Sequence, residues 1–572
     1  MTEAILVFAL AIGLGWPLGR YLAAVMRSEP MRLDRAFAPV ERPLYRLLGT
    51  DPSRGMSWRG YAKAFLLSNL VVGGLVWALF MTQAWLPLNP DAIPNMRWDT
   101  ALHTMVSFLT NTNQQHYSGQ AQLSYLSQMV GIVGLQVITP MMGLALVVAT
   151  LRALMGGRQA MAPGSDPAKT AGSEPDVGNY WTDLVRPTLR FMLPLCLLWS
   201  VLLTSQGVPA TLQAGSVATP VDASVEMKEQ KIPLGPVAPM VAVKQLGTNG
   251  GGWYGPNSAV PLENPTPLSN LLETLALVLV PVAVAFMVGP FTGRRKFTAL
   301  VFGSMLLMSL LSTGAGILLE GHAAASTATP ALMEGKEVRF GADASALWAT
   351  LTTQTSNGSV NAMHASLAPL TGLVTLGNML VNAIWGGIGC GLQQFLVYLM
   401  LAVFLAGLMT GRTPELFGRK IEAREVRLLS LLVLLQPLVV LGFTAAALAI
   451  PSLTGNSNPG FHGISQVFYE YTSAFANNGS GFEGLGDATT WWNLSCVVVL
   501  ALGRYPALVV PLAIAASLAR KRHAPEGPGS LHIETPTFAL TTIAVIVILT
   551  LLQFMPALVL GPVADHLSLA VR

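Results

Sequence analysis

The sequence predicts an all-α polytopic membrane protein with about ten transmembrane helices, arranged as four span–pore-helix–span repeats around a pseudo-fourfold pore. Three observations predict this class. Only 11% of the 572 residues are charged and 52% are hydrophobic, whereas soluble domains carry about 25% charged residues. Apolar stretches of about twenty residues recur along the whole chain. Four of the segments between them share one polar pattern.

Each apolar stretch is long enough to cross about 30 Å of hydrocarbon as a helix. The predicted spans are about 4–26, 62–84, 127–151, 187–206, 268–290, 297–319, 370–410, 428–450, 493–519 and 535–561. The seventh is too long for one straight helix. Its four glycines, each costing roughly 1 kcal/mol in a helix, predict a break at Gly386, Gly387, Gly389 and Gly391.

The basic residues predict the topology. Five loops hold most of the 33 Lys and Arg residues, at about 20–63, 152–190, 294–296, 412–427 and 520–522. The positive-inside rule makes these loops cytoplasmic and places the amino terminus outside. The net charge of +4 therefore reflects orientation in a lipid bilayer, and no nucleic-acid partner is predicted.

Four outer loops are rich in Asn, Thr, Ser and Gly, and each follows a helical run too short to cross a bilayer. Non-helical backbone at membrane depth is tolerated where it lines an aqueous path. A half-helix entering from outside also directs its negative dipole end inward, which favours a cation. Because the loops contain no Asp or Glu, their oxygens suit a monovalent ion such as potassium better than calcium or magnesium.

The candidate potassium-binding residues belong to these four loops. They are Thr110, Asn111, Thr112, Asn113 and Gln115; Thr248, Asn249, Gly250, Gly251 and Gly252; Thr355, Ser356, Asn357, Gly358 and Ser359; and Asn477, Asn478, Gly479 and Ser480. Gly reaches positive φ freely and Asn more readily than most residues, as stacked carbonyls require. The alternative is a set of ordinary Asn/Gly turns.

Several other residues have two possible roles. The four glycines of the seventh span form either a gate beneath the loops or a close helix contact. Arg504 lies inside a span, where a charge costs at least about 2.5–3.5 kcal/mol. It is either an electrostatic barrier at the inner end of the pore or a side chain paired with a carbonyl. Arg412 belongs to the gate or forms an ion pair with Glu415.

The metal-ligating residue types show no useful spacing. The eight histidines are scattered and the three cysteines are isolated in apolar stretches. His116 is expected at the surface of the outer mouth. We therefore predict no cofactor and no metal other than transported potassium, held by the loop residues alone.

The four loops occur together with further distinctive segments: Ser124-Tyr-Leu-Ser-Gln, Glu263-Asn-Pro-Thr-Pro, Asn361-Ala-Met-His, Gly386-Gly-Ile-Gly-Cys-Gly and Gly411-Arg-Thr-Pro-Glu. In this combination the chain resembles the KdpA family, the potassium-binding subunit of the bacterial potassium-transporting P-type ATPase complex. That family belongs to the superfamily of potassium transporters. The resemblance covers essentially the whole chain.

The resemblance implies a non-catalytic subunit of a high-affinity uptake complex in the bacterial inner membrane. Potassium would enter the filter from the periplasm and leave through a tunnel toward a P-type ATPase subunit that hydrolyses ATP. Two small accessory membrane subunits would complete the complex. Relative to the usual family pattern, the chain has Gln114 for Trp, Ala365 for Asp, Asn382 for Glu, and Glu483 for a small or apolar residue.

Two alternatives remain from the residues themselves. The chain is either a subunit of a pump or a self-sufficient potassium channel or symporter of the same superfamily. A polytopic membrane enzyme would need clustered His, Asp, Glu or Cys within the spans, and the sequence shows no such cluster.

The chain divides into a first helix with its basic loop, four repeats, a linker and a last helix. The predicted boundaries are 1–61 for the first helix and loop, 62–155 for repeat 1, 156–181 for a flexible cytoplasmic linker, 182–293 for repeat 2, 294–426 for repeat 3 with the broken helix, 427–522 for repeat 4 and 523–572 for the last helix.

Overall fold

The computed structural model describes residues 1–572 apart from 32–33, 162–173, 223–226, 327–332, 525–530 and 571–572. In the described part of the chain, ten helical segments are long and apolar enough to cross a membrane. They are Thr2–Met26, Trp58–Trp85, Ser127–Leu154, Tyr180–Ser205, Pro267–Thr292, Arg295–Gly321, Cys390–Thr410, Ala423–Ala449, Thr490–Ala519 and Pro536–Leu569. The protein is a multi-pass helical membrane protein, as predicted.

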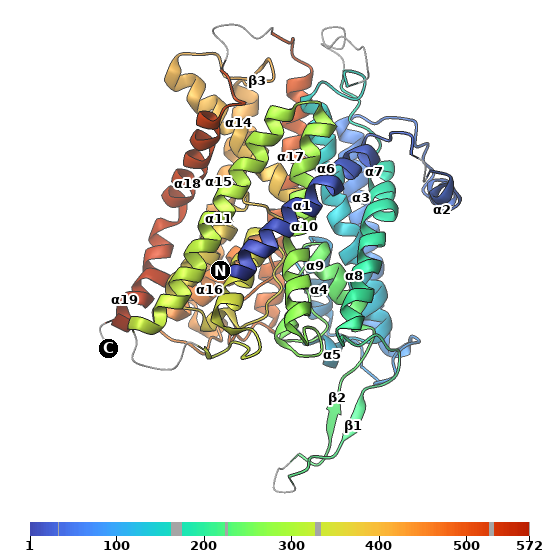
Figure 1. The fold of residues 1–572 in the computed structure, drawn as a ribbon, viewed down its shortest axis with the longest axis vertical. Helices are drawn as coiled ribbons and strands as arrows, with labels where there is room; N and C mark the ends of the chain where they lie inside the picture. The colour runs from blue at the N-terminus through green and yellow to red at the C-terminus, as the bar shows by residue number, and fades with distance from the viewer. Residues whose placement is uncertain (32–33, 162–173, 223–226, 327–332, 525–530, 571–572) are drawn as a thin grey trace.

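These segments are formed by the following helices of Figure 1. They are α1 (Thr2–Met26), α3 (Trp58–Thr82), α6 (Gly134–Leu154), α7 (Tyr180–Pro187), α8 (Leu193–Ser205), α10 (Pro267–Thr292), α11 (Arg295–Ser326), α14 (Cys390–Thr410), α15 (Ala423–Ala449), α17 (Thr490–Ala519), α18 (Pro536–Leu558) and α19 (Ala564–Ala570). Short π-helical turns at Ser127–Val133, Thr188–Met192 and Val559–Val563 lead into α6, join α7 to α8, and join α18 to α19. Two further short helices, α2 (Asp34–Leu47) and α5 (Gly119–Gln122), lie in the connecting loops.

The predicted seventh span consists of two helices. α13 (Pro369–Val381) ends at Asn382, which adopts the left-handed conformation with φ 46°, and α14 begins only at Cys390. The predicted break is therefore confirmed, but it starts four residues before the first glycine. Asn382 is held there because its side chain accepts a hydrogen bond from Ser356 Oγ at 2.8 Å.

Four half-length helices lie between pairs of spans, and each leads into one of the polar loops. They are α4 (Trp98–Leu109), α9 (Val237–Leu246), α12 (Gly341–Gln354) and α16 (Phe461–Phe475). Figure 1 shows α4, α9 and α16 in the same half of the molecule. Their length of 10 to 15 residues corresponds to roughly half the thickness of a bilayer.

Close packing brings α1 against α10. A Cβ on Gly15 would lie 2.6 Å from Val282 Cγ1, and one on Gly19 would lie 2.5 Å from the carbonyl oxygen of Ala283. Small residues therefore permit this contact between helices, as is usual in membranes. α10 begins with a capping box in which Thr266 and Ser269 bind each other's backbone amides.

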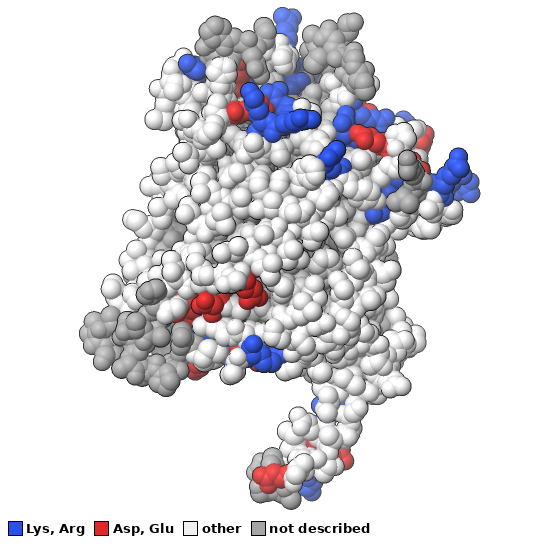
Figure 2. All heavy atoms as spheres, in the orientation of Figure 1, with Lys and Arg blue, Asp and Glu red and all other residues white. Residues whose placement is uncertain are grey.

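Charged side chains divide the surface into zones. Figure 2 shows Lys and Arg gathered at the end of the molecule that carries α2 and β3, next to a broad uncharged band. This distribution agrees with the positive-inside rule. Part of the predicted linker 156–181 lies outside the described residues.

Two small sheets depart from the all-α expectation. β1 (Ser216–Ala218) pairs antiparallel with β2 (Gln230–Ile232), with Val217 opposite Lys231. This hairpin extends away from the end opposite α2 (Figure 1). The second sheet pairs β3 (Glu415–Leu416) with β4 (Arg419–Lys420). Both lie between spans, in polar stretches where water can satisfy the exposed strand edges.

Candidate functional site

The four half-helices end in the same way. In each, the backbone N–H of a loop residue donates to the carbonyl oxygen five positions earlier, in the last turn of the helix. The four bonds join Thr112 to Ser107 (2.9 Å), Asn249 to Lys244 (2.9 Å), Asn357 to Thr352 (3.0 Å) and Asn478 to Ser473 (2.9 Å). This bond pattern resembles the Schellman motif, and its repetition gives the four loops one register.

The loops also share an unusual backbone. In each, two residues separated by one have positive φ: Asn111 (63°) and Asn113 (58°), Thr248 (51°) and Gly250 (84°), Ser356 (50°) and Gly358 (85°), and Asn477 (52°) and Gly479 (101°). Positive φ is uncommon for residues other than glycine. Its occurrence at matching positions of all four loops excludes the alternative of unrelated turns.

The loops form a closed ring. A Cβ on Gly250 would lie 1.9 Å from the carbonyl oxygen of Asn357, one on Gly358 would lie 2.0 Å from that of Asn478, and one on Gly479 would lie 2.1 Å from that of Thr112. These contacts join loop 2 to loop 3, loop 3 to loop 4 and loop 4 to loop 1. The remaining junction is made by Asn111 Nδ2, which donates to Thr248 O at 3.0 Å.

Asn113 distinguishes the first loop from the other three. It occupies the position of Gly250, Gly358 and Gly479, and it is 3% exposed. Among the described residues, neither its side-chain nitrogen nor its side-chain oxygen has a hydrogen-bond partner. A buried amide without partners is costly, so this side chain is a candidate ligand for a bound ion or water.

Some of the predicted potassium-binding residues stabilise the ring through hydrogen bonds of their side chains. Gln115 exchanges two hydrogen bonds with the backbone of Gly252, at 2.9 and 3.0 Å. The Ser480 hydroxyl donates to Asn478 Oδ1 at 2.6 Å. The hydroxyls of Thr110 and Thr355 bond back to carbonyls of their own half-helices. These hydroxyls therefore help to fix the ends of α4 and α12.

The break before α14 lies directly against the ring. A Cβ on Gly387 would have three side-chain atoms within 4 Å, one each from Ser356, Thr248 and Asn111. Ser356, Thr248 and Asn111 are each the first residue with positive φ in their loop. The N–H of Ile388 donates to Thr248 Oγ1 at 3.2 Å. The glycine segment thus lies against the ring, and its role as a gate stays a prediction.

The other glycines keep the break compact. The N–H of Gly386 donates to Gln354 O at 2.7 Å. A Cβ on Gly389 would lie 2.2 Å from Gly143 O, and one on Gly391 would lie 1.8 Å from Trp385 O. Close packing, the alternative predicted from the sequence, is therefore also present.

The two candidate arginines lie far apart. Arg504 is 2% exposed and donates to Cys390 Sγ at 2.6 Å and to Thr139 O at 3.2 Å. It thus contacts the first residue of α14, beside the break. Arg412 follows the other end of α14, about 30 Å away along the helix axis, and is exposed. The structure therefore does not bring Arg412 together with the four glycines.

Two of the departures from the family pattern are neighbours in space. Glu483 Oε2 accepts a hydrogen bond from the N–H of Ala365 at 2.9 Å. A carboxylate thus lies beside position 365 although the side chain there is a methyl group. The third departure, Gln114, donates its amide to the Glu470 carboxylate. The fourth, Asn382, contacts loop 3 through Ser356.

The Glu483 carboxyl group is expected to make the folding stability of the chain depend on pH. It lies in the loop between α16 and α17, where burial raises its pKa to about 7 and hydrogen bonding opposes the rise. Because the folded pKa exceeds the unfolded value, the stabilising contribution is fully present below about pH 4.5 and is lost as the pH rises toward 7. At pH 8 the Glu483→Gln variant should therefore have a higher melting temperature than the unmodified protein. At pH 4.5 the two melting temperatures should differ little.

Thermal unfolding in detergent across this pH range measures the effect. Glu334→Gln, at an exposed acidic residue in the loop between α11 and α12, is the control and should leave the pH profile unchanged. A constant difference between Glu483→Gln and the unmodified protein at every pH would contradict the prediction.

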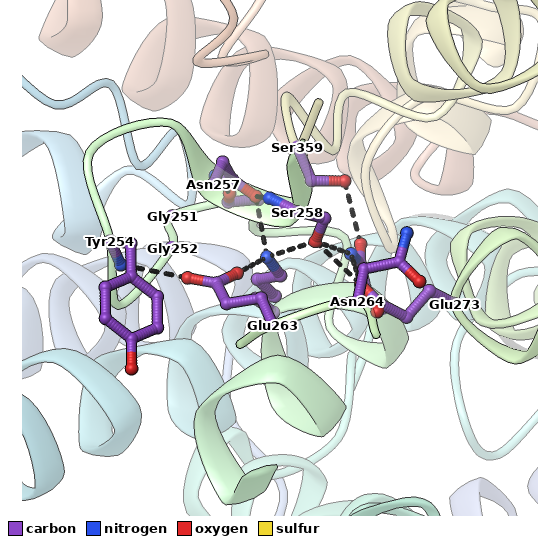
Figure 3. A network of polar contacts seen from close by, with 12 residues as sticks. Gly251, Gly252, Tyr254, Asn257, Ser258, Glu263, Asn264, Glu273 and Ser359 are labelled. Carbon is purple, nitrogen blue, oxygen red and sulfur yellow. Dashed lines mark hydrogen bonds and ion pairs between the residues drawn. The ribbon is translucent and has the colours of Figure 1, made fainter. Parts of the chain in front are cut away.

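The sequence did not reveal the polar network that supports loop 2. The Lys244 side chain is fully buried and donates to Asn257 Oδ1 at 2.6 Å, to Ser258 Oγ at 2.7 Å and to the Glu263 carboxylate. Glu263 in turn accepts from the N–H of Tyr254 at 2.9 Å. Figure 3 shows the side chains of Asn257, Ser258 and Glu263 converging near Gly251 and Gly252.

The same network continues to loop 3. Ser258 and Gln245 both donate to Glu273 Oε2, at 2.7 and 2.8 Å, and Gln245 Oε1 accepts from Ser359 Oγ at 2.9 Å (Figure 3). The only sequence signal was a single basic residue, Lys244, followed by the polar Gln245, in the otherwise apolar run Val237–Leu246.

One further expectation is wrong. His116 is 1% exposed, so it is not a surface residue. The structure also brings His103, His116 and Cys496 together, with their ligand atoms within 4.8 Å of one another. The spacing of these residues along the chain gave no sign of this cluster, because three separate segments contribute to it.

Comparison with known proteins agrees with this architecture. The family described as "Potassium-transporting ATPase A subunit" matches residues 5–567. A protein of Gloeobacter violaceus named "Potassium-transporting ATPase potassium-binding subunit" is 47% identical over 564 residues, covering 96% of this chain and 95% of its own length. A protein of the same name from Pseudomonas aeruginosa is 44% identical, with 96% of both chains covered.

A solved structure shares the fold. The potassium transporter TrkH from Vibrio parahaemolyticus superposes with a TM-score of 0.50 at 16% sequence identity, covering 89% of this chain and 96% of that one.

Proposed function

The chain belongs to the family of potassium-transporting ATPase A subunits, and from this premise we propose that it binds potassium in the ring of four loops and passes the ion to an ATP-hydrolysing partner. The observation that carries the proposal is the closed ring with positive φ at matching positions of all four loops. Alternating left- and right-handed backbone can direct successive carbonyl oxygens to one side, where they replace the hydration shell of an ion.

The electrostatics of the ring favour a monovalent cation. All four half-helices end at the loops, so the negative ends of four helix dipoles lie beside the ring. The loop residues that form it include no carboxylate. Strongly hydrated divalent ions prefer carboxylate ligands, so a ring of neutral oxygens suits potassium.

The break before α14 supports a controlled exit. Gly387 lies against three of the four loops, and the buried Arg504 lies beside the start of α14. A fixed positive charge there opposes passage of a cation straight to the cytoplasm. We propose that the ion instead leaves sideways, toward a P-type ATPase subunit.

The proposed setting follows the orientation of the charges. The end with most Lys and Arg would face the cytoplasm of a bacterial inner membrane, with the amino terminus and the ring facing the periplasm. Small accessory membrane subunits would complete the complex. This chain would supply ion binding, and the partner would hydrolyse ATP.

Rubidium tracer uptake tests the function. Cells lacking their own potassium importers would express the chain alone or with its P-type ATPase partner, at low external potassium. We expect uptake only with the partner and none after ATP depletion. Equal uptake by the chain alone, driven by the membrane potential, would identify an independent channel or symporter and contradict the proposal.

A further inference from the structure

The short helix α2 (Asp34–Leu47) carries an apolar stripe on its outer surface. Its exposed apolar residues recur at intervals of three or four positions, as on one face of a helix. Val40 is 51% exposed and Leu47 is 83% exposed. We call this face the α2 stripe, and it consists of Ala36, Pro39, Val40, Pro43 and Leu47. Exposed apolar surface of this kind marks a contact with a protein or a membrane.

Three arginines flank the α2 stripe. Arg35, Arg42 and Arg46 are exposed and follow one another at intervals of seven and four residues. At about 100° per residue they therefore lie together along one side of the stripe. Among the described residues, none of the three has an ion-pair partner. Their charge is available to an anionic ligand, and Figure 2 shows basic side chains over this part of the surface.

The opposite face of α2 is fixed to the helix bundle. Glu41 is 6% exposed and accepts hydrogen bonds from Arg190 Nε at 2.6 Å and from Arg190 Nη2 at 2.8 Å. Asp34 pairs with Arg190 as well. Tyr45, which follows Glu41 by one turn, is also buried. Both carboxylates of α2 are thus neutralised at the bundle, and every exposed side chain of the helix is apolar or basic.

Arg190 also sets the depth of α2 in the membrane. It lies in the turn between α7 and α8, inside the membrane-crossing segment Tyr180–Ser205. Leu193 and Leu197, about 5 and 10 Å further along this segment, are 40% and 68% exposed and therefore face lipid. The Tyr21 hydroxyl donates to Arg190 O at 3.0 Å, and tyrosine is typical of the membrane interface. α2 thus lies beside the bundle, next to α7, at the level of the lipid headgroups (Figure 1).

We propose that the α2 stripe docks into the headgroup layer of anionic phospholipids, with Arg35, Arg42 and Arg46 bound to the lipid phosphates. A helix with an apolar stripe and a basic flank lies in the plane of the membrane interface. Arginine matches the geometry of phosphate with two parallel hydrogen bonds, and a negative membrane surface attracts clustered basic residues. Free phosphate would leave the apolar stripe in water, so a lipid is the ligand that fits both features.

Fluorescence quenching by spin-labelled lipids tests the proposal in vesicles. The full-length chain, purified with its ATPase complex, would carry a bimane fluorophore on the thiol of the Val40→Cys variant. The unmodified chain, treated in the same way, gives the background. The vesicles would contain equal amounts of either spin-labelled phosphatidylglycerol or spin-labelled phosphatidylcholine. We expect phosphatidylglycerol to quench at least about threefold more strongly, because each arginine near the surface favours the anionic lipid.

Two triple variants in the Val40→Cys background separate the α2 arginines from the net charge of the chain. Replacing the three α2 arginines by glutamine should make both lipids quench equally. The matched control, Arg424→Gln/Arg427→Gln/Arg520→Gln, removes the same charge from exposed positions at the ends of α15 and α17. It should retain the preference for phosphatidylglycerol.

The labelled Val40→Cys protein with all its arginines is decisive even where a triple variant misfolds. Absence of quenching by both lipids would place the α2 stripe in water or against another protein, and would overturn the proposal. Equal quenching by both lipids, or loss of the preference in the control variant, overturns it as well. Quenching requires no ion transport, and rubidium binding by the same preparations reports the ring, so failure of the lipid site and failure of the proposed potassium function are distinguishable.

Discussion

Replacement of Gly358 by alanine is expected to abolish high-affinity potassium binding while the chain still inserts and assembles. Gly358 has φ 85°, and a Cβ there would lie 2.0 Å from the carbonyl oxygen of Asn478. The left-handed conformation alone costs a residue with a side chain about 1–2 kcal/mol. That is roughly tenfold in an equilibrium constant, and the overlap can be relieved only by displacing a ring carbonyl. We expect a loss of affinity of at least about 100-fold.

Rubidium binding to the purified complex measures the loss, and two variants calibrate it. Gly377→Ala on α13 is the control, since no atom lies within 4 Å of the added Cβ, and it should bind normally. Gly251→Ala should be milder than Gly358→Ala, because its Cβ would meet the side chains of Phe108 and Asn113 rather than backbone. Normal affinity in Gly358→Ala would show that the ring is not the binding site.

Replacement of Lys244 by methionine is expected to cause the largest loss of stability. Lys244 and Glu263 are both fully buried and paired. Removing the ammonium group leaves an uncompensated buried carboxylate, which costs about 3–5 kcal/mol in comparable pairs. Potassium binding should weaken as well, because the Lys244 ammonium group holds Asn257, whose side-chain amide donates to the carbonyl oxygen of Gly250 in loop 2.

Thermal unfolding in detergent measures the destabilisation. The double variant Lys244→Met/Glu263→Gln should recover much of the lost stability, because it removes both charges. Lys231→Met is the matched control, because Lys231 also pairs with a carboxylate, Asp91, but its side chain is 45% exposed. It should change stability by less than about 1 kcal/mol. A Lys244→Met variant as stable as the Lys231→Met variant would contradict the prediction.

The candidate site was predictable to the extent that it depends on local sequence. The four Asn/Gly loops were located from their composition, and the structure brings them together in one ring. The break before α14 was predicted from its glycines, although it begins at Asn382. Arg504 was recognised because a charge inside a span is conspicuous. Arg412 was grouped with the gate or with Glu415, and the structure places it at the opposite end of α14 from the break.

Contacts between distant segments were not predictable in the same way. Lys244 meets Glu263 only after the chain folds back beneath loop 2. His103, His116 and Cys496 come from α4, the loop after it and α17, and no regular spacing in the sequence connects them. The contact between the Glu483 carboxylate and the backbone of Ala365 is likewise visible only in space.

The sequence by itself determined the ten membrane-crossing segments, the half-length helices between them and the Asn/Gly composition of the four loops, although Thr248 and Ser356 adopt positive φ where only Gly and Asn were expected to. These features follow from the thickness of the bilayer and from the conformational preferences of single residues, so they need no knowledge of distant neighbours. The tertiary structure alone decided which loop follows which around the ring, which buried charges are paired and which histidines meet the cysteine. Each of these depends on buried polar groups finding partners from other segments, since hydrocarbon offers them none.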